Sequence, residues 1–186
     1  MYTIVALLPQ NLVAALEPHR RKYDPQAHII PPHITVVEPF KFSGSIEPLY
    51  HHLEEIGETH APVRVSLVGW DAYTQSDYQL HLPLVTGRLE FSALREDLMT
   101  GPLAHLAERE NRYWPHITLG RFASLADLDR AKQALRGFEA QFTFGVTSLE
   151  LLYRRRSIQP WETQQRVSLE GTVMSMPRKR ELVQIN

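Results

Sequence analysis

The chain contains the same four-residue word twice, and this repeat limits the folds that it can adopt. Pro-His-Ile-Thr occurs at residues 32–35 and again at residues 115–118, followed each time by another apolar residue. β-Branched and apolar residues around both copies are typical of strands. Successive side chains of a strand point to opposite faces. Each copy is therefore expected to present an imidazole and a hydroxyl on one face and apolar anchors on the other.

The hydrophobic periodicity around the two copies predicts alternating helices and strands. Each copy is preceded and followed by a predicted helix, and each second helix leads into strands. Pro39 is expected to end the first copy's strand, because proline cannot donate to a ladder. The predicted helices cover residues 12–21 (unless Pro18 ends it earlier), 45–58, 90–108 (with a break at residues 101–102) and 125–135, and the other predicted strands cover residues 2–8, 63–73, 78–85, 114–122, 141–154 and 164–169.

This order of elements indicates an internal duplication. We predict an α+β fold with two pseudo-symmetric lobes, each a largely antiparallel sheet backed by helices. A central cleft between the lobes is expected to carry both His-x-Thr strands. No segment is long enough to be a linker between independent domains, so residues 1–186 are expected to form a single bilobal domain.

Composition excludes several classes of function. The net charge is −1 and the charged fraction is 22%, so no overall basic field points to nucleic acid. The absence of cysteine excludes disulfides, thiolate catalysis and cysteine-bound metals. No apolar run reaches the ~18 residues of a membrane span, and residues 1–9 read as a strand, not a signal peptide. We expect a cytoplasmic protein with no membrane association and no obligate protein partner.

Paired His-x-Thr motifs in the two halves of a chain of this length resemble the two-histidine phosphoesterase superfamily. Within it, the chain is most similar to the 2′-5′ RNA ligase-like family of RNA 2′,3′-cyclic phosphodiesterases. The resemblance spans nearly the whole chain in element order, motif position and the proline before each histidine. It implies two catalytic pairs, His33 with Thr35 and His116 with Thr118. It also implies that Arg121, shortly after the second motif, holds phosphate.

Three residues near the motifs need separate expectations. By strict alternation Arg121 faces away from His116, so a phosphate contact requires a bulge or a curled side chain. Gly120 falls on the His116 face, where a missing side chain would leave room for a ligand. After the first motif many family members carry Phe-Leu-Gly, whose aromatic ring contacts a base. Here that run is Glu38-Pro39-Phe40, which makes Phe40 the candidate replacement.

The implied chemistry is the opening of a cyclic phosphodiester by water. One group must take a proton from water while another gives a proton to the leaving ribose oxygen, and histidine suits both tasks with a pKa of ~6.5. Which histidine is the base stays open, and a bell-shaped pH–rate profile is expected. Positioned donors to the phosphoryl oxygens would each contribute roughly 2–4 kcal/mol. No metal or other cofactor is required. The expected substrate is an RNA end or a nucleotide with a cyclic phosphate, and reverse 2′-5′ ligation is implied as well.

Other readings remain open. The protein could hydrolyse 2′-5′ oligonucleotides or another phosphodiester, or it could be a non-catalytic nucleotide- or RNA-binding module. Metal binding by the two motif histidines is disfavoured, because no carboxylate or third histidine lies at ligand spacing. The remaining candidates could instead be packing or solvated residues. The candidates for substrate binding are Tyr113, Tyr153, Arg154 and Trp161, and the candidates for the cleft are Trp114 and His81. The basic run at residues 178–180 is expected to be a solvated tail.

Overall fold

The computed structural model describes residues 1–75, 77–107 and 113–172, so the predicted tail at residues 178–180 lies outside the described residues. No helix in these ranges has an apolar stretch long enough to cross a bilayer. The strands are β1 (Tyr2–Leu7), β2 (His33–Phe40), β3 (Val63–Val68), β4 (Asp71–Tyr73), β5 (Tyr78–Thr86), β6 (His116–Phe122), β7 (Gln141–Val146), β8 (Ser148–Tyr153) and β9 (Glu162–Ser168). The helices are α1 (Gln10–Tyr23), α2 (Glu47–Thr59), α3 (Arg88–Leu98), the short 3-10 helix η1 (Gly101–Leu106) and α4 (Leu125–Ala134).

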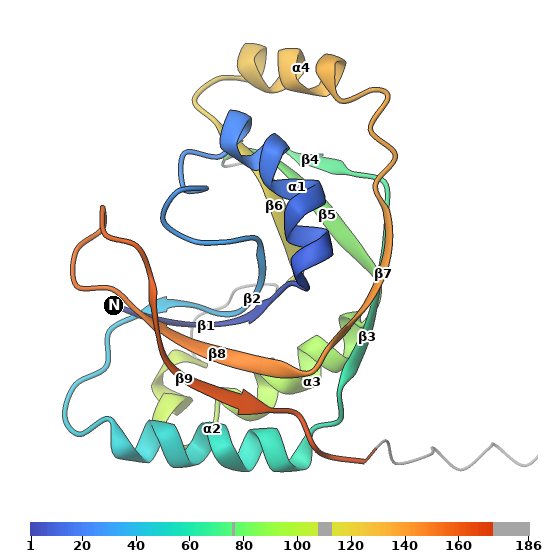
Figure 1. The fold of residues 1–186 in the computed structure, drawn as a ribbon. Helices are drawn as coiled ribbons and strands as arrows, with labels where there is room; N and C mark the ends of the chain where they lie inside the picture. The colour runs from blue at the N-terminus through green and yellow to red at the C-terminus, as the bar shows by residue number, and fades with distance from the viewer. Residues whose placement is uncertain (76, 108–112, 173–186) are drawn as a thin grey trace, which may run out of the picture.

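The strands form one curled sheet in the order β7-β3-β5-β6-β2-β1-β8-β9, with β4 paired to β5. Every described strand pair is antiparallel. Figure 1 shows β8 and β9 running at a steep angle to β5 and β6, which reflects the curl. The predicted α+β class with an antiparallel sheet is confirmed. The two predicted sheets, however, are halves of a single sheet that meet where β2 pairs with β6.

The helices cross over between these halves. Helix α1 follows β1 in the chain but packs against β6, in the other half of the sheet. Helix α3 lies between β5 and β6 in the chain, yet it contacts β2. Helix α4 also packs on β5 and β6, and α2 packs on β9. The two halves of the sheet are therefore joined both by the helices and by the pairing of the central strands.

Several predicted boundaries were wrong. Residues 63–73 form two strands, because Gly69 turns the chain with φ of +71°. Residues 141–154 form two strands that go to opposite ends of the sheet, since β7 pairs with β3 and β8 pairs with β1. Pro39 does not end β2, which continues to Phe40. The predicted helix to residue 21 is confirmed, since α1 continues through Pro18. The predicted break in the third helix is confirmed, as α3 ends before η1 begins.

Candidate active site

The two copies of the repeated word lie side by side. Strands β2 and β6 pair antiparallel with Ile34 opposite Ile117. This register sets His33 beside Thr118 and Thr35 beside His116, all on one face of the sheet. The two histidines are then diagonal neighbours, with Cα atoms about 7–8 Å apart. Both isoleucines are 0% exposed and anchor the opposite face in the core. The structure therefore brings together the four residues of the predicted catalytic pairs.

Both imidazole rings are fixed in the same way. The Nδ1 atom of His33 lies 2.8 Å from the carbonyl of Pro31, and Nδ1 of His116 lies 2.8 Å from the carbonyl of Trp114. A carbonyl oxygen only accepts, so Nδ1 carries the proton and each Nε2 keeps a lone pair. The proline before each histidine restricts the residue that precedes the proline, Pro31 or Trp114, to extended backbone conformations. The repeated Pro-His pair thus orients both rings so that Nε2, and not Nδ1, is the basic nitrogen.

Burial lowers the pKa of both rings. It lowers the pKa of His33 to about 4, against the opposing effect of the Pro31 carbonyl and with help from the charges of Arg20 and Arg121. Burial likewise lowers the pKa of His116, with a further lowering by Arg121. Both imidazoles are therefore neutral near pH 7 in the free protein. An anionic phosphodiester bound between them would favour the imidazolium form and raise both pKa values.

Gln79 is a site residue that the sequence reasoning missed. Its side-chain amide lies 2.9 Å from Nε2 of His116 and donates to the hydroxyl of Thr118 at 2.9 Å. It comes from β5, where it stands opposite Arg121. Side-chain alternation could have identified it, because Gln79 and the cleft candidate His81 share one face of the strand predicted at residues 78–85.

Arg121 lies on the histidine face because β6 contains a bulge. The β5–β6 register shifts by one residue between Leu80 and His81, so that Arg121 stands opposite Gln79. The shift reverses the facing that strict alternation predicts. The effect of Arg121 on the pKa of both motif histidines agrees with this placement. The bulge that a phosphate contact would need is therefore present.

The same bulge overturns the expectation for Gly120. This residue stands opposite the core residue Leu80, not on the ligand side. A Cβ atom added at Gly120 would lie 2.7 Å from Cβ of Tyr23 and 2.9 Å from the ring of Phe122. The missing side chain therefore lets the end of α1 pack closely on β6, and it leaves no room for a ligand.

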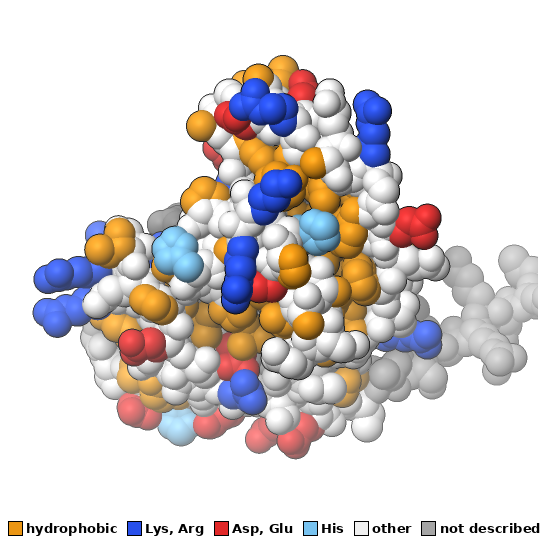
Figure 2. Space-filling model, turned by 45° about the horizontal axis from the view of Figure 1, so that its top comes forward, with side chains coloured by type: hydrophobic (Ala, Val, Ile, Leu, Met, Phe, Trp, Pro, Cys, Tyr) orange, Lys and Arg blue, Asp and Glu red, His pale blue; other side chains and the backbone are white. Residues whose placement is uncertain are grey.

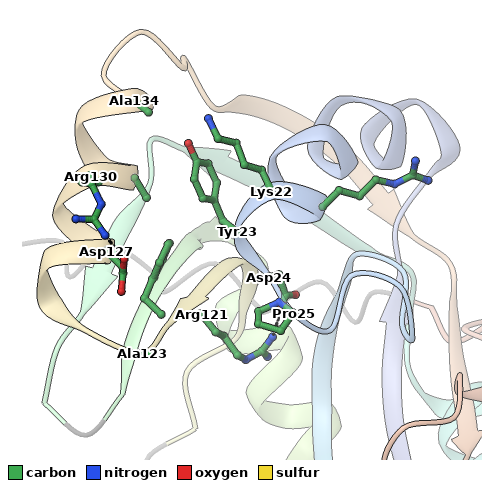
Figure 3. Close-up of a pocket in the computed structure, with 12 residues that line it drawn as sticks. Lys22, Tyr23, Asp24, Pro25, Arg121, Ala123, Asp127, Arg130 and Ala134 are labelled. Atoms are coloured by element: carbon green, nitrogen blue, oxygen red, sulfur yellow. Dashed lines mark hydrogen bonds and ion pairs between the residues drawn. The ribbon is translucent and has the colours of Figure 1, made fainter.

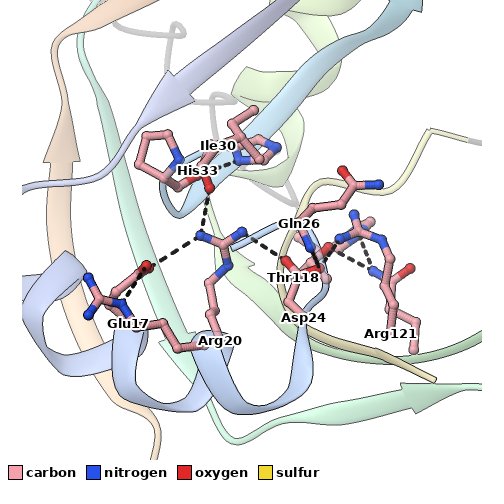
Figure 4. Close-up of polar contacts among 12 residues, drawn as sticks. Glu17, Arg20, Asp24, Gln26, Ile30, His33, Thr118 and Arg121 are labelled. Atoms are coloured by element: carbon pink, nitrogen blue, oxygen red, sulfur yellow. Dashed lines mark hydrogen bonds and ion pairs between the residues drawn. The ribbon is translucent and has the colours of Figure 1, made fainter. Parts of the chain in front are cut away.

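A buried charge network holds Arg121 in place (Figure 4). Arg121 donates to Asp24 at 2.7 Å, and Arg20 donates to the other carboxylate oxygen of Asp24 at 2.8 Å. The Asp24 side chain is 0% exposed and that of Arg20 is 1% exposed. Arg20 also donates to the carbonyl of Ile30, in the loop that leads to His33. The contacts of the Asp24 carboxylate and of Arg20 therefore connect the end of α1, the loop before the first motif, and the arginine that follows the second motif.

Two predicted substrate contacts are wrong. Phe40 is 2% exposed and packs against Tyr2, with ring centroids 6.0 Å apart. It lies at the opposite end of β2 from His33, about 20 Å along the strand. Tyr153 stacks on the other side of Tyr2 at 4.8 Å. Both rings lie at the sheet end where β1, β2 and β8 meet, away from His33, so neither is placed to contact a base held at the motifs.

The other predicted contacts lie nearer the motifs. The Arg154 guanidinium stacks 4.4 Å from the centre of the Trp161 ring. The Trp161 backbone donates to the carbonyl of Ile29 in the loop before the first motif. Tyr113 donates its hydroxyl to the carbonyl of Thr35 at 2.9 Å, so it braces the second motif against the first. Arg154 and Trp161 remain candidates for substrate contact, whereas the geometry gives Tyr113 a bracing contact.

His81 lies beneath the site and makes stability depend on pH. It is 3% exposed, and its ring meets those of His116 and Trp114 edge-on at 5.2 Å and 5.3 Å. Burial lowers its pKa to about 4, with a smaller lowering by His116. His81 is therefore protonated at a lower pH in the folded form than in the unfolded form. The unfolding free energy falls as the pH drops from about 6.5 to about 4.

We expect His81 alone to remove about 2 kcal/mol of unfolding free energy between pH 7 and pH 5. His81→Phe keeps an aromatic ring but cannot titrate, so chemical denaturation should give a smaller loss over this range. His51→Gln, at an exposed side chain of α2, is the matched control and should leave the pH dependence unchanged. An unchanged dependence in His81→Phe would show that His81 does not contribute.

Comparison with known proteins agrees with this geometry. A model of the 2′-5′ RNA ligase superfamily matches residues 8–158. A Bacillus licheniformis protein, named only as a candidate phosphoesterase, is 24% identical over 154 residues and covers 82% of this chain and 89% of its own length. A similarly named protein of Halalkalibacterium halodurans is 29% identical over 157 residues, covering 81% of this chain and 87% of its own.

Two solved structures share the fold. The protein TT0787 of Thermus thermophilus superposes with a TM-score of 0.68 at 19% identity, covering 91% of this chain and 98% of that one. Escherichia coli LigT in complex with 3′-AMP has a TM-score of 0.62 at 19% identity, covering 90% of this chain and 97% of that one. The curled antiparallel sheet with its helices is therefore common to all three proteins.

Proposed function

This chain belongs to the 2′-5′ RNA ligase superfamily, and on that premise we propose that it is a metal-independent phosphoesterase. Its substrate would be the 2′,3′-cyclic phosphate of an RNA end or a nucleotide. The observation that carries the proposal is the pair of imidazoles from β2 and β6, each with Nδ1 bound to a carbonyl and with Nε2 as the proton acceptor. The Nε2 lone pair of His116 accepts from the Gln79 amide, a hydrogen bond that proton transfer at His116 would replace. The complex of LigT with 3′-AMP, in a protein of the same fold, supports a nucleotide as the ligand.

The proposed mechanism uses both histidines in one in-line displacement. Nε2 of one neutral histidine takes a proton from water as the water oxygen bonds to phosphorus. The bond from phosphorus to one ribose oxygen breaks, and that oxygen receives the proton held on Nε2 of the other histidine. The products are a phosphomonoester and a free hydroxyl. The same displacement with a ribose 5′-hydroxyl in place of water, and with the 3′-oxygen leaving, would give a 2′-5′ phosphodiester, which is ligation. Acid–base catalysis of this kind contributes typically about 10²–10⁴-fold for each group.

Three further groups would stabilise the transition state. The phosphoryl oxygens gain charge as water adds, and Thr35, Thr118 and Arg121 are the donors on the histidine face. Each positioned donor would contribute roughly 2–4 kcal/mol. Gln79 already contacts both His116 and Thr118, so it holds these two side chains in place before substrate binds.

The test is hydrolysis of 2′,3′-cyclic mononucleotides with and without EDTA. We expect turnover that EDTA leaves unchanged, because the two imidazoles supply both proton transfers. The kcat/KM profile should be bell-shaped with its optimum below about pH 6.5, since the pKa of each histidine is lowered in the free protein. Binding without turnover would favour a binding module, and turnover lost in EDTA would overturn the metal-independent mechanism. Turnover of 2′-5′ oligonucleotides alone would redirect the proposal to that substrate.

A further inference from the structure

A cavity lies between the end of α1 and helix α4, and it shares Arg121 with the site. Its volume is about 550 Å³, a size that suits one nucleotide. Figure 3 shows Lys22 and Tyr23 on one side, Asp127 and Arg130 on the other, and Arg121 at the base. The Tyr23 ring projects into the space between the two helices. The two motif histidines are not among the described residues that line this cavity, so it is distinct from the reaction site.

The carboxylates of this cavity are already neutralised. Asp24 contacts both Arg20 and Arg121, with N–O distances of 2.8 Å and 2.7 Å. On the opposite wall, Asp127 pairs with Arg130 within the first turns of α4. Each carboxylate therefore has its own cationic partner, and neither adds an uncompensated negative charge that would repel an anion.

Lys22 leaves this cavity with a local excess of positive charge. It pairs with no carboxylate among the described residues, and its ammonium group lies 5.0 Å from the Tyr23 ring centre. In Figure 2, Lys and Arg side chains appear as separate groups over this face, not as one basic field. The cavity is therefore a local cationic site in a protein whose net charge is −1, and it favours an anion such as a phosphate.

The walls of the cavity also suit an aromatic base. Tyr23 offers a flat ring, and Phe122 lies beside it with ring centroids 6.0 Å apart. Ala131 and Ala134 add apolar surface from α4. A ring that stacks on a base is worth roughly 5- to 100-fold in affinity and tolerates any sequence. Phosphate and base contacts thus occur together in one cavity.

Arg121 connects this cavity to the histidines. It lines the cavity, and it stands opposite Gln79, whose amide contacts His116 and Thr118. A single guanidinium held by Asp24 therefore belongs both to the cavity wall and to the histidine face of the sheet. Resting on the function proposed above, we propose that the α1–α4 cavity binds a second nucleotide of the substrate, so that the preferred substrate is an oligonucleotide end and not a cyclic mononucleotide.

The experiment compares kcat/KM for a dinucleotide and a mononucleotide. The probes are adenylyl-(3′→5′)-adenosine 2′,3′-cyclic phosphate and adenosine 2′,3′-cyclic phosphate. We expect the wild-type protein to prefer the dinucleotide by roughly 5- to 100-fold. Tyr23→Leu, which keeps the Cβ atom that packs on Gly120, should remove most of this preference. Lys22→Gln and Arg130→Gln should each lower the preference about 2- to 5-fold, the scale of an exposed charge contact.

The controls separate this inference from the proposed function. Lys132→Gln removes a cation from α4 outside the cavity and should keep the wild-type preference. Hydrolysis of neither probe by wild-type protein would remove the proposed function and, with it, this inference. Equal hydrolysis of both probes would leave the function standing and overturn the second-nucleotide site. A preference that persists unchanged in Lys22→Gln, Arg130→Gln and Tyr23→Leu would overturn the assignment to this cavity.

Discussion

Replacing His33 or His116 by alanine is expected to lower kcat/KM for 2′,3′-cyclic mononucleotides by about 10²–10⁴-fold, because each variant loses one of the two proton transfers. The two losses should not add. Once one imidazole is gone the concerted displacement has already failed, so the double variant should be little worse than the weaker single variant. Steady-state kinetics on the three variants and the wild-type protein measure both effects.

Folding must be checked in the same samples. Both histidines begin their strands, and the core anchors are Ile34 and Ile117 on the opposite face. Thermal unfolding should therefore remain cooperative in each variant. His51→Ala on α2, whose side chain is 74% exposed, is the matched histidine control and should retain wild-type kinetics. Full activity in either His33→Ala or His116→Ala would remove that histidine from the mechanism.

The pairing of these histidines could be predicted because it depends on local rules. The period of two along a strand puts His and Thr on one face and Ile on the other. Repetition of the word in both halves then implied matching strands, and β2 and β6 are indeed neighbours. The general fold class followed from the same periodicity. Within each copy, both inferences use only residues that are close together in the sequence.

What could not be predicted depends on contacts between distant segments. The facing of Arg121 is set by a one-residue shift against β5, which no pattern within β6 reveals. Phe40 is buried because β1 places Tyr2 against it. The stretch 141–154 has continuous β-propensity, but its two parts pair with strands at opposite ends of the sheet. The role of Asp24 could not be predicted from the sequence, since one of the two arginines that it contacts comes from the other half of the chain.

Asp24→Asn is expected to destabilise the protein by about 3–5 kcal/mol, the cost of removing one partner from a buried ion pair. Burial by itself would raise the pKa of Asp24, but Arg121 and Arg20 outweigh it and hold the pKa below its ordinary value. The carboxylate is therefore ionised throughout the neutral range. Asparagine keeps the shape but not the charge, so the carboxylate that remains beside the buried Arg20 is that of Glu17, at the longer distance of 3.4 Å. Urea denaturation at pH 7 measures the loss.

The control for this stability measurement is an aspartate at the surface. Asp129 forms an exposed pair with Lys132 on α4, at an N–O distance of 3.6 Å. Exposed pairs of this kind contribute little, so Asp129→Asn should cost less than about 1 kcal/mol. Equal losses in the two variants would show that the buried network around Asp24 has no special weight in the stability of the fold.

Asp24→Asn should also affect catalysis, at temperatures where the variant remains folded. Arg121 loses its anchor, so we expect kcat/KM to fall at least about 10-fold, within the roughly 2–4 kcal/mol of one positioned donor. The negative charge of Asp24 raises the pKa of His33, and its removal should shift the limb of the kcat/KM profile that His33 controls to lower pH. A purely structural role would not move that limb. Arg121→Gln separates the two effects, because Asp24 keeps its pair with Arg20: kcat/KM should fall with a smaller loss of stability. Wild-type kcat/KM and an unmoved pH profile in folded Asp24→Asn would show that Asp24 does not position Arg121 for the reaction.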